Sequence, residues 1–527
     1  MSSALGGLSE FDTELLRRNR FCMGVKRGNE YRCGGDASEE ERGKAVDLLV
    51  EAVGRILKWR VWRTWWIEEI TDEWLIARDR LETQLRGRYS DDVVNDLLGM
   101  VDKFISYNED FWQYWQTVGG EAKKLVDDLL SGRAEVIVWE GEKGISVHGN
   151  YMTLEVGRTS TGGVTVQLSL EGLEGVTIEV PDVFVKTMSR EEYGRFINEV
   201  LMALRGGLEK ADGYIEDGKA AMGTTQVWQA VVWALLYPGE NYMHINDVNV
   251  NEGSVTVAYF LRSSHDQLKG KILSDAEKLS EKELLAFMFT AILGDGWAGI
   301  VKPIINGRAY DEAVVKITMS DEEFKGWEPL LRRLMSMGFN WRPEPVSDGV
   351  VDVRFYGSNA IDLARAMINA LPPILRDIMD ALSFEKWLNL RRISEMELKF
   401  RRGEMQVNVA GYGFTVKVHD GTIVLEHKAR DEVGADEVIN ALKANYGNEF
   451  HAYVNKGSKY LTIVIPMYVF ERYDDIKAQV IEVLRRKLEK TKDERKRRII
   501  TKHLMRLMAP TEGAAAAYLN NHEGGGA

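Results

Sequence analysis

The stretch ELLAFMFTAILGDG, from Glu283 to Gly296, is the part of this 527-residue chain that says most about its fold. Its small residues Ala286, Thr290 and Gly294 recur at every fourth position, so they share one face of a helix. Small residues at this spacing allow two helix backbones to approach closely. The stretch is therefore predicted to be a helix that packs against a second helix through this face.

The end of this predicted helix carries an acidic residue, Asp295, followed by Gly296, which is expected to cap the helix in the left-handed conformation. The C-terminal end of a helix dipole favours cations, so an aspartate there is easier to explain with a cation nearby. Carboxylate oxygens are ligands that Mg²⁺ prefers. Asp295 is therefore a candidate ligand of Mg²⁺ or another cation.

The residues around this helix alternate regularly between helical and strand patterns. Two strands are predicted near WAGIV and AVVKITM, and a helix follows over Asp321–Met337. Two more strands near NWRPE and VVDVRFY lead to a helix over Ala360–Leu371. Residues 281–371 are therefore predicted to form one module with the order αββαββα.

The nonapeptide MFTAILGDG, Met288 to Gly296, resembles the motif that names the LAGLIDADG family, and the predicted order of the module supports the resemblance. Phe289 stands where the family usually has a small residue. The resemblance implies a DNA-cleaving or DNA-binding fold in which two such helices pack together and each ends in an acid that holds a catalytic metal ion. It thereby makes Asp295 the candidate catalytic residue, with Mg²⁺ as the expected cofactor if the chain cleaves DNA. It also implies that the flanking sheets form a saddle in the major groove of double-stranded DNA.

The basic residues of the chain suggest where such DNA would be contacted. Lys302, Arg308 and Lys316 of the predicted module are candidates for phosphate or base contacts from the sheet. The run Arg495, Lys496, Arg497 and Arg498 is a candidate electrostatic anchor in a basic C-terminal helix. For each of these residues, a solvated surface position is the alternative.

A cleaving enzyme of this kind needs a second acid, and no second Gly-Asp-Gly occurs in the expected place. Asp377, Asp380 and Glu385 follow Pro373, where a second leading helix is expected. The alternative for all three is that they are solvated or locally paired charges. A homodimer formed through the Ala286 face is another way to supply a second Asp295. If neither holds, the chain is expected to bind DNA without cutting it.

The whole chain is predicted to be an α+β protein of several domains, whose expected boundaries follow shifts in periodicity. The expected domains are a flexible arm (1–37), a Trp-rich helical domain (38–132), a β-rich α+β domain (133–280), the LAGLIDADG-like module (281–371), a candidate degenerate second module ending in a basic helix (372–509) and a disordered tail (510–527). In the second domain, Trp59, Trp62 and Trp66 are expected to line one helical face, either as core or as a platform for a partner protein.

Composition narrows the class of protein further. Cys22 and Cys33 fit no metal motif, so both are expected to be free thiols in a reducing compartment. No apolar run is long enough to span a membrane and no signal peptide is recognised, so a cytoplasmic location is expected. The net charge of −13 argues against a nucleic-acid binder, although cations cluster between Ile476 and Leu507.

The chain also resembles the PaREP proteins (type two-b) of hyperthermophilic archaea in the blocks AFMFTAILGDGWAG, DEAVVKITMSDEEFKGWEPLL and PPILRDIMDALSFEKW. That resemblance implies a thermophilic archaeal source and a mobile-element origin. Three functions are therefore expected as alternatives. They are Mg²⁺-dependent cleavage of double-stranded DNA, DNA binding by a catalytically degenerate relative, and protein interaction through the Trp-rich domain.

Overall fold

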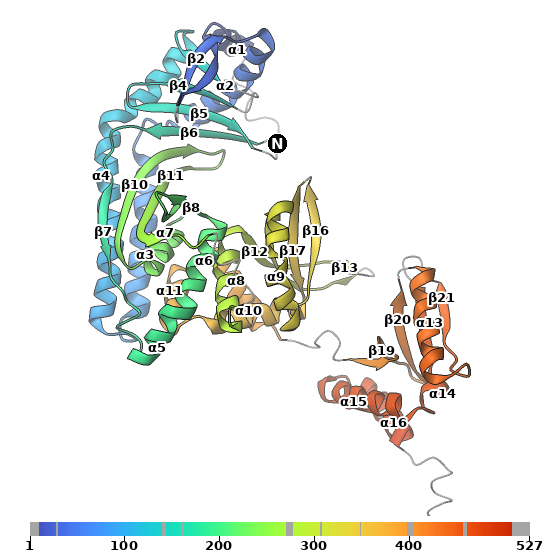
Figure 1. Ribbon diagram of the computed structural model, residues 1–527. Coiled ribbons are helices and arrows are strands. Elements are labelled where there is room, and N and C mark those ends of the chain that lie inside the picture. Colours follow the sequence, from blue (N-terminus) through green and yellow to red (C-terminus); the bar gives the residue numbers. More distant parts are fainter. Residues whose placement is uncertain are drawn as a thin grey trace, which may run out of the picture. The chain divides into compact units, whose positions relative to one another are not determined.

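The computed structural model describes residues 10–27, 30–139, 144–159, 163–269, 278–305, 308–347, 349–397, 405–429, 431–456 and 461–508. The chain divides into two compact units, Met1–Glu395 and Met396–Ala527. Both units mix helices with sheets, which confirms the predicted α+β class. Figure 1 shows the elements with the labels used below.

The first unit begins with helices that pack on a large sheet. Its N-terminal elements are α1 (Glu10–Arg17), β1 (Arg20–Arg27), β2 (Glu30–Asp36), α2 (Glu39–Trp59), α3 (Trp65–Leu85) and α4 (Asp91–Leu130). A capping box starts α2, with Ser38 and Glu41 bonded to each other's backbone N–H groups. The helix ends where Arg60 takes the left-handed conformation, with a φ of 46°. Trp59 and Trp66 therefore lie on different helices, and the expected single Trp face does not form.

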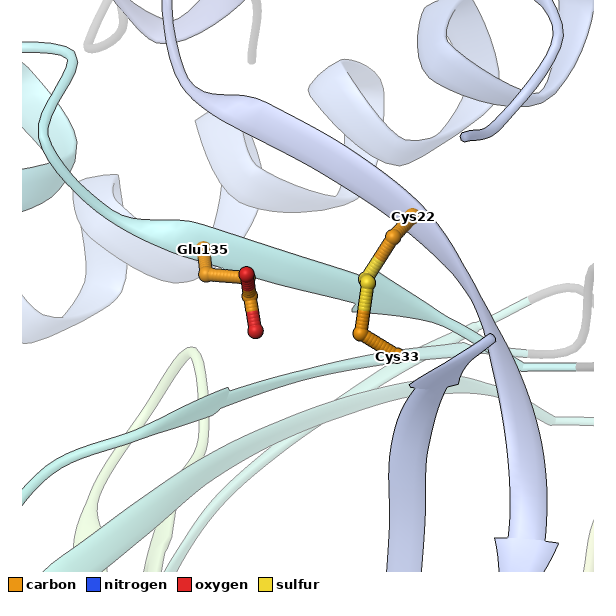
Figure 2. Close-up of side chains that lie close together, drawn as sticks. All are labelled: Cys22, Cys33 and Glu135. Carbon is orange, nitrogen blue, oxygen red and sulfur yellow. A yellow bond between two sulfur atoms is a disulfide. The ribbon is translucent and has the colours of Figure 1, made fainter. Parts of the chain in front are cut away.

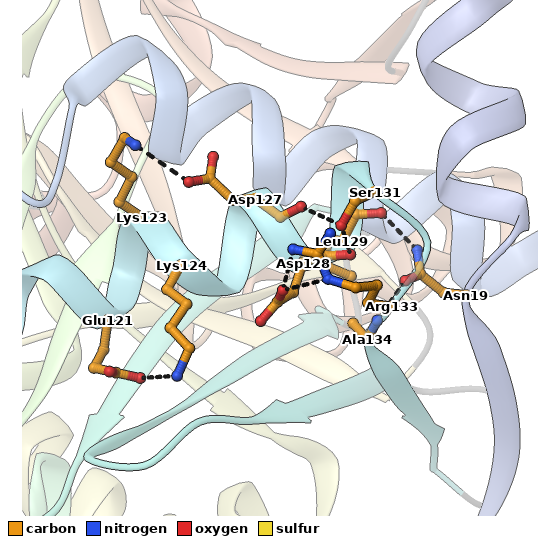
Figure 3. Close-up of polar contacts among 10 residues, drawn as sticks. All are labelled: Asn19, Glu121, Lys123, Lys124, Asp127, Asp128, Leu129, Ser131, Arg133 and Ala134. Atoms are coloured by element: carbon orange, nitrogen blue, oxygen red, sulfur yellow. Dashed lines mark hydrogen bonds and ion pairs between the residues drawn. The ribbon is translucent and has the colours of Figure 1, made fainter.

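Most of residues 1–37 are built into the domain, so the expected flexible arm is wrong for the described part of this segment; residues 1–9 lie outside the described residues. The buried Asn19 donates to the Leu129 carbonyl at 2.8 Å and accepts from the Ala134 N–H at 2.8 Å. Figure 3 shows this link at the end of α4, beside the Arg133–Asp128 ion pair. Strand β1 is consequently held parallel to β3 (Glu135–Val138).

Cys22 and Cys33 form a disulfide, so the expectation of free thiols is wrong. The two residues lie on the neighbouring antiparallel strands β1 and β2, with their Cα atoms 5.5 Å apart. Figure 2 shows the bond, with Glu135 of β3 close to both sulfur atoms. The sequence spacing could not show this pairing, because the hairpin brings together residues that are eleven positions apart.

The large sheet has eleven strands and includes β3 to β11. The successive strands β3 to β6 pair antiparallel as a meander, with β4 at Gly144–His148, β5 at Met152–Arg158 and β6 at Val164–Leu170. Strand β7 (Val176–Val180) pairs instead with β10 (Gly239–Val250). A short helix α5 (Arg190–Arg195) and a π-helical turn (Phe196–Val200) then lead into α6 (Leu201–Ala211). Trp66, Trp74 and Trp115 are buried, so the Trp-rich helices supply an aromatic core.

Two successive segments of the first unit have the same order of elements. In one, α6 is followed by β8 (Gly213–Glu216), β9 (Lys219–Thr224), α7 (Val227–Leu236), β10 (Gly239–Val250) and β11 (Val255–Asp266). In the other, α8 (Glu281–Asp295) is followed by β12 (Gly296–Val301), β15 (Glu312–Ser320), α9 (Asp321–Ser336), β16 (Trp341–Ser347) and β17 (Val350–Tyr356). A small hairpin of β13 (Ile304–Ile305) and β14 (Arg308–Ala309) interrupts the second. We call these segments module 1 and module 2.

The two modules also share their strand order. Module 1 contributes β8-β9-β11-β10 to one end of the large sheet, and module 2 forms a separate sheet β12-β15-β17-β16. In both, the edge strand directly follows the leading helix. The order αββαββα predicted for 281–371 is found in module 2 and α10 (Ser358–Ala370), but its counterpart lies upstream, within the segment expected to be an unrelated β-rich domain.

The helices α11 (Pro373–Leu382) and α12 (Glu385–Glu395) belong to the first unit, which ends at Glu395 and not at residue 371. The second unit contains β18 (Gln406–Val409), β19 (Tyr412–Val418), β20 (Ile423–Ala429), α13 (Glu432–Tyr446), β21 (Tyr453–Lys456), β22 (Leu461–Pro466), α14 (Met467–Phe470), α15 (Asp474–Lys490) and α16 (Glu494–Met508). Its sheet order β19-β20-β22-β21 repeats that of the modules, but no helix equivalent to α6 or α8 precedes β19 among the described residues.

The tail expected to be disordered, 510–527, lies outside the described residues. Within the described ranges, none of the helices has both the length and the apolar character that crossing a membrane requires.

Candidate metal and nucleic-acid site

The helices α6 and α8 pack against each other in parallel, as Figure 1 shows at the junction of the modules. Gly207 of α6 lies against the Phe287 carbonyl and the Thr290 hydroxyl of α8, and Gly294 of α8 lies against Ala211. A Cβ atom added at either glycine would overlap these neighbours. The contact therefore depends on backbones that touch without intervening side chains.

The face of α8 identified in the sequence is the face that meets α6. Ala286 and Thr290 are buried, and the Thr290 hydroxyl donates to the Leu204 carbonyl of α6 at 2.8 Å. Phe289 points elsewhere, with its ring 5.8 Å from that of Trp387, so it does not separate the two helices. The partner helix is α6 of the same chain.

This pairing brings two acids to one end of the helix pair. Asp212 caps α6 and Asp295 ends α8, and each is followed by a glycine that begins the edge strand of its module. A Cβ atom at Gly294 would lie 2.5 Å from an Asp212 carboxylate oxygen, so this carboxylate rests against the residue that precedes Asp295. The two carboxylates thus flank the point where the modules meet.

The glycine after each acid lies where there is no space for a side chain. A Cβ at Gly296 would lie 2.5 Å from the Ile292 carbonyl oxygen, and one at Gly213 would lie 2.5 Å from the Glu209 Cα, which is again four residues earlier. Gly296 is extended, with φ −95° and ψ 174°, so the expected left-handed cap is wrong. Glycine is needed here for space and not for a positive φ.

The surroundings of the two acids disfavour their charged forms. Asp295 is exposed as a residue, yet partial burial of its carboxyl and the charges of Asp212 and Glu323 raise its pKa to about 6. Burial also raises the pKa of Asp212, which accepts a 2.5 Å hydrogen bond from the Gln229 side chain. Among the described residues, no hydrogen-bond donor holds the Asp295 carboxylate, which leaves it open to a cation.

A lysine from outside both modules lies beside the acids. Lys386 of α12 donates from its Nζ atom to the carbonyl oxygens of Leu293, at 2.7 Å, and Gly294, at the end of α8. Burial lowers the pKa of Lys386, whereas the charges of Asp212 and Asp295 raise it. Lys386 therefore partly balances the acid pair and satisfies the last carbonyls of the helix.

The raised pKa of Asp295 predicts how stability depends on pH. Because its folded pKa of about 6 exceeds the unfolded value near 4, the native state holds the proton more tightly, and stability falls as pH rises through this window. Asp295→Asn is therefore expected to raise the Tm at pH 7.5 by about 2–4 °C. The difference in Tm between Asp295→Asn and the wild type should disappear near pH 4. Thermal denaturation followed by circular dichroism measures it. If Asp311→Asn, an exposed control, gave the same profile, the effect would not come from the acid pair.

The open faces of the two sheets carry equivalent rows of residues. In module 2 the row runs across the strands as Trp297, Lys316, Arg354 and Arg342, and in module 1 as Tyr214, the buried Ala221, Arg262 and Tyr242. An aromatic ring stands at the edge of each row, two residues after the acid. The equivalent positions show that the two modules present corresponding faces.

The candidate DNA-contacting residues differ in whether their positive charges are paired with acidic side chains. Lys316 pairs with the buried Asp352 at 2.8 Å, and Arg354 pairs with both Asp352 and Glu344 at 2.7 Å. Lys302 is exposed just after β12, while Arg308 lies in β14 with a side chain outside the described residues. Lys316 is thus less available than Lys302.

The predicted basic run lies at the start of α16 in the second unit. Arg495, Lys496 and Arg498 are exposed. Arg497 instead donates to the carbonyls of Leu488, at 2.8 Å, and Thr491, at 3.0 Å, and so closes the end of α15. The predicted long basic helix is consequently two helices, and Arg497 joins them.

The second acid was not found at Asp377 or Asp380, because both are locally paired. Asp377 accepts from the Tyr89 hydroxyl at 2.7 Å, and Asp380 accepts from the Trp387 indole at 2.7 Å. The residue that the sequence reading missed is Asp212. Its signal was present, because Ala203, Gly207 and Ala211 precede Asp212 at the spacing of Ala286, Thr290 and Gly294 before Asp295.

Comparison with known proteins finds only distant structural similarity. No family model and no curated protein matches the chain. Solved structures similar to it include the I-SmaMI LAGLIDADG homing endonuclease bound to cleaved DNA, with 12% identity and a TM-score of 0.14 over 44% of this chain and 98% of that one. Another is the LAGLIDADG meganuclease I-AabMI bound to uncleaved DNA, with 11% identity and a TM-score of 0.12 over 42% and 97%. These TM-scores are too low to support a function for this chain, so the function proposed below is based on the geometry of the site.

Proposed function

We propose that the chain hydrolyses phosphodiester bonds of DNA with a divalent metal ion, at a site formed by Asp212 and Asp295. The observation that carries the proposal is the pairing of α6 and α8, which places two acids from two modules at one helix junction. Two carboxylates held together at a junction that is open to solvent suit the binding of a cation and a phosphate. Both modules needed for the site come from one chain.

The residues present fit Mg²⁺. The donors are carboxylate oxygens, and Mg²⁺ is commonly bound by one or two carboxylates together with water and substrate phosphate. The raised pKa of Asp295 also supports a cation, because a nearby acid disfavours its charge and a metal ion would relieve this. When bound, the ion would polarise the phosphate and lower the pKa of an attacking water.

The residues of the chain have separable roles in this proposal. Gln229 fixes the Asp212 carboxylate through a 2.5 Å hydrogen bond, and Thr224 in turn donates to Gln229. Asp295, which has no such partner among the described residues, is free to adjust to a ligand. Lys386 lies where its ammonium group could also attract a phosphate. Double-stranded DNA is the substrate that the family resemblance implies, with the two sheet faces as its contact surface.

Metal binding is the first property to test. Titration of Mn²⁺, as a paramagnetic substitute for Mg²⁺, is expected to show a site that either Asp212→Asn or Asp295→Asn weakens roughly 10-fold or more. Affinity should rise with pH through about 6, because the metal ion competes with the proton on Asp295. Asp311→Asn serves as the control. Equal affinity in wild type and both site variants would refute a shared metal site.

DNA binding without cleavage is the second candidate. It is favoured by Lys386, whose ammonium group already stands beside both acids. Under this alternative, Mn²⁺ would not bind and DNA affinity would survive both aspartate substitutions. The third expectation, a protein platform of Trp59, Trp62 and Trp66, loses support because Trp66 is buried and donates to the Val61 carbonyl at 3.0 Å.

A further inference from the structure

Two exposed aromatic side chains stand at equivalent places beside the acid pair. Tyr214 is the second residue after Asp212, and Trp297 is the second residue after Asp295. Their exposed fractions, 38% and 39%, are nearly the same. Each lies on the edge strand of its sheet, β8 or β12. Large exposed rings at matching positions of two modules are unusual, because an aromatic side chain is more stable when buried.

The Trp297 ring lies against its own strand. A Cβ atom at Gly299, two residues further along the same face, would lie 2.5 Å from the indole ring. The absence of a side chain at Gly299 thus allows the indole to cover the strand and leave its outer face in solvent. Tyr214 is supported in a different way, with its ring 5.6 Å from that of Phe260 in β11. Both rings thus contact their own sheet and stay partly exposed.

The charged residues near the two rings do not favour the binding of duplex DNA mainly through its phosphates. Lys316 and Arg354 are paired with acids, and Arg262 faces Glu216 and Asp217 at 3.8 and 3.6 Å. Residues 1–395 contain 46 lysines and arginines against 63 acids, whereas residues 396–527 contain 22 against 18. The site therefore lies in the acidic unit, where attraction to the densely charged phosphates of a duplex is weak.

We infer that Tyr214 and Trp297 stack on unpaired bases on either side of the scissile phosphate, so that the preferred substrate is single-stranded or locally unpaired DNA. This inference rests on the proposed function, because it places the bases next to the Asp212 and Asp295 site. Stacking needs a free base face, which a B-form duplex does not offer, and it tolerates any base sequence. Exposed rings, beside Lys316, Arg354 and Arg262 that are paired with acids, suit this mode better than reading of a major groove.

The test is fluorescence anisotropy with three labelled DNA probes of random sequence: a single strand, a duplex and the same duplex with a central mismatched bubble. EDTA in the buffer prevents cutting. Wild-type protein is expected to bind the single strand and the bubble roughly 10-fold or more tightly than the duplex. Tyr214→Ala and Trp297→Ala should each weaken binding to the single strand by roughly 5- to 100-fold.

Trp65→Ala is the matched control, because Trp65 of α3 has a similar exposed fraction of 37% and lies in the helical part of the unit. Trp297→Phe should keep most of the affinity, which separates stacking from loss of fold. Duplex binding as tight as binding to the bubble, or variants no weaker than Trp65→Ala, would overturn the inference. Stacking that depends on both rings, without Mg²⁺-dependent cutting in a separate assay, would overturn the nuclease proposal and leave only the base-stacking part of this inference standing.

Discussion

Gly207→Ala is expected to lower the free energy of unfolding by about 3 kcal/mol, because overpacking a tight contact forces backbones apart. The added methyl group would overlap the Phe287 carbonyl oxygen and the Thr290 hydroxyl. The hydroxyl could rotate away, but the carbonyl belongs to the backbone of α8 and cannot. Separating the helices would also weaken the hydrogen bond from Thr290 to Leu204. Urea denaturation measures the change.

The matched control is Gly326→Ala in α9, where an added Cβ meets no atom within 4 Å. This change should stabilise the protein by about 0.5–1 kcal/mol, because alanine favours a helix more than glycine does. Gly294→Ala should behave like Gly207→Ala, since its Cβ would overlap Ala211. If Gly207→Ala were as stable as Gly326→Ala, the close pairing of α6 and α8 would be contradicted.

Module 2 could be predicted because its determinants are local. The periodicity of small residues, the turn glycines and the alternating strands all lie within 281–371, and the structure shows the expected order there. The two added strands β13 and β14 are short and carry no clear alternation, which is why the sequence did not reveal them. The face of α8 was visible for the same reason, since it depends on spacing alone.

Module 1 could not be recognised as readily, because α6 carries charged residues where a core helix is expected to be apolar. Glu209 is buried and accepts hydrogen bonds from the Tyr237 hydroxyl, at 2.5 Å, and from the N–H groups of Leu268 and Lys269. Arg205 is also buried and lies over the Tyr237 ring. Such charges are compatible with burial only when distant partners satisfy them, and a linear sequence does not show those partners.

The errors near the N-terminus have a similar cause. The segment expected to be a flexible arm has little periodicity of its own, and its order comes from long-range contacts such as those of Asn19 with Leu129 and Ala134. The disulfide between Cys22 and Cys33 likewise depends on a hairpin register. In the second unit, the break at 491–493 between α15 and α16 was not predicted either.

Loss of either acid is expected to reduce Mg²⁺-dependent DNA cutting roughly 10³-fold or more, because the metal contributes several kcal/mol to the transition state. The effect of Asp212→Asn should equal that of Asp295→Asn, although the two residues belong to different modules. The double variant should be no worse than either single one, since groups that act as a unit are not additive. Substitution of Asn for Asp keeps the size of each side chain, so folding is expected to persist.

The central claim is that both modules of a single chain contribute one acid each to one site. The most direct measurement is the rate of Mg²⁺-dependent cutting of a random-sequence DNA library, with bubbles included, by wild type, Asp212→Asn, Asp295→Asn and the control Asp311→Asn. The account predicts cutting by wild type and the control, and its loss in both site variants. Cutting by Asp212→Asn at the wild-type rate, or none by folded wild type, would contradict it.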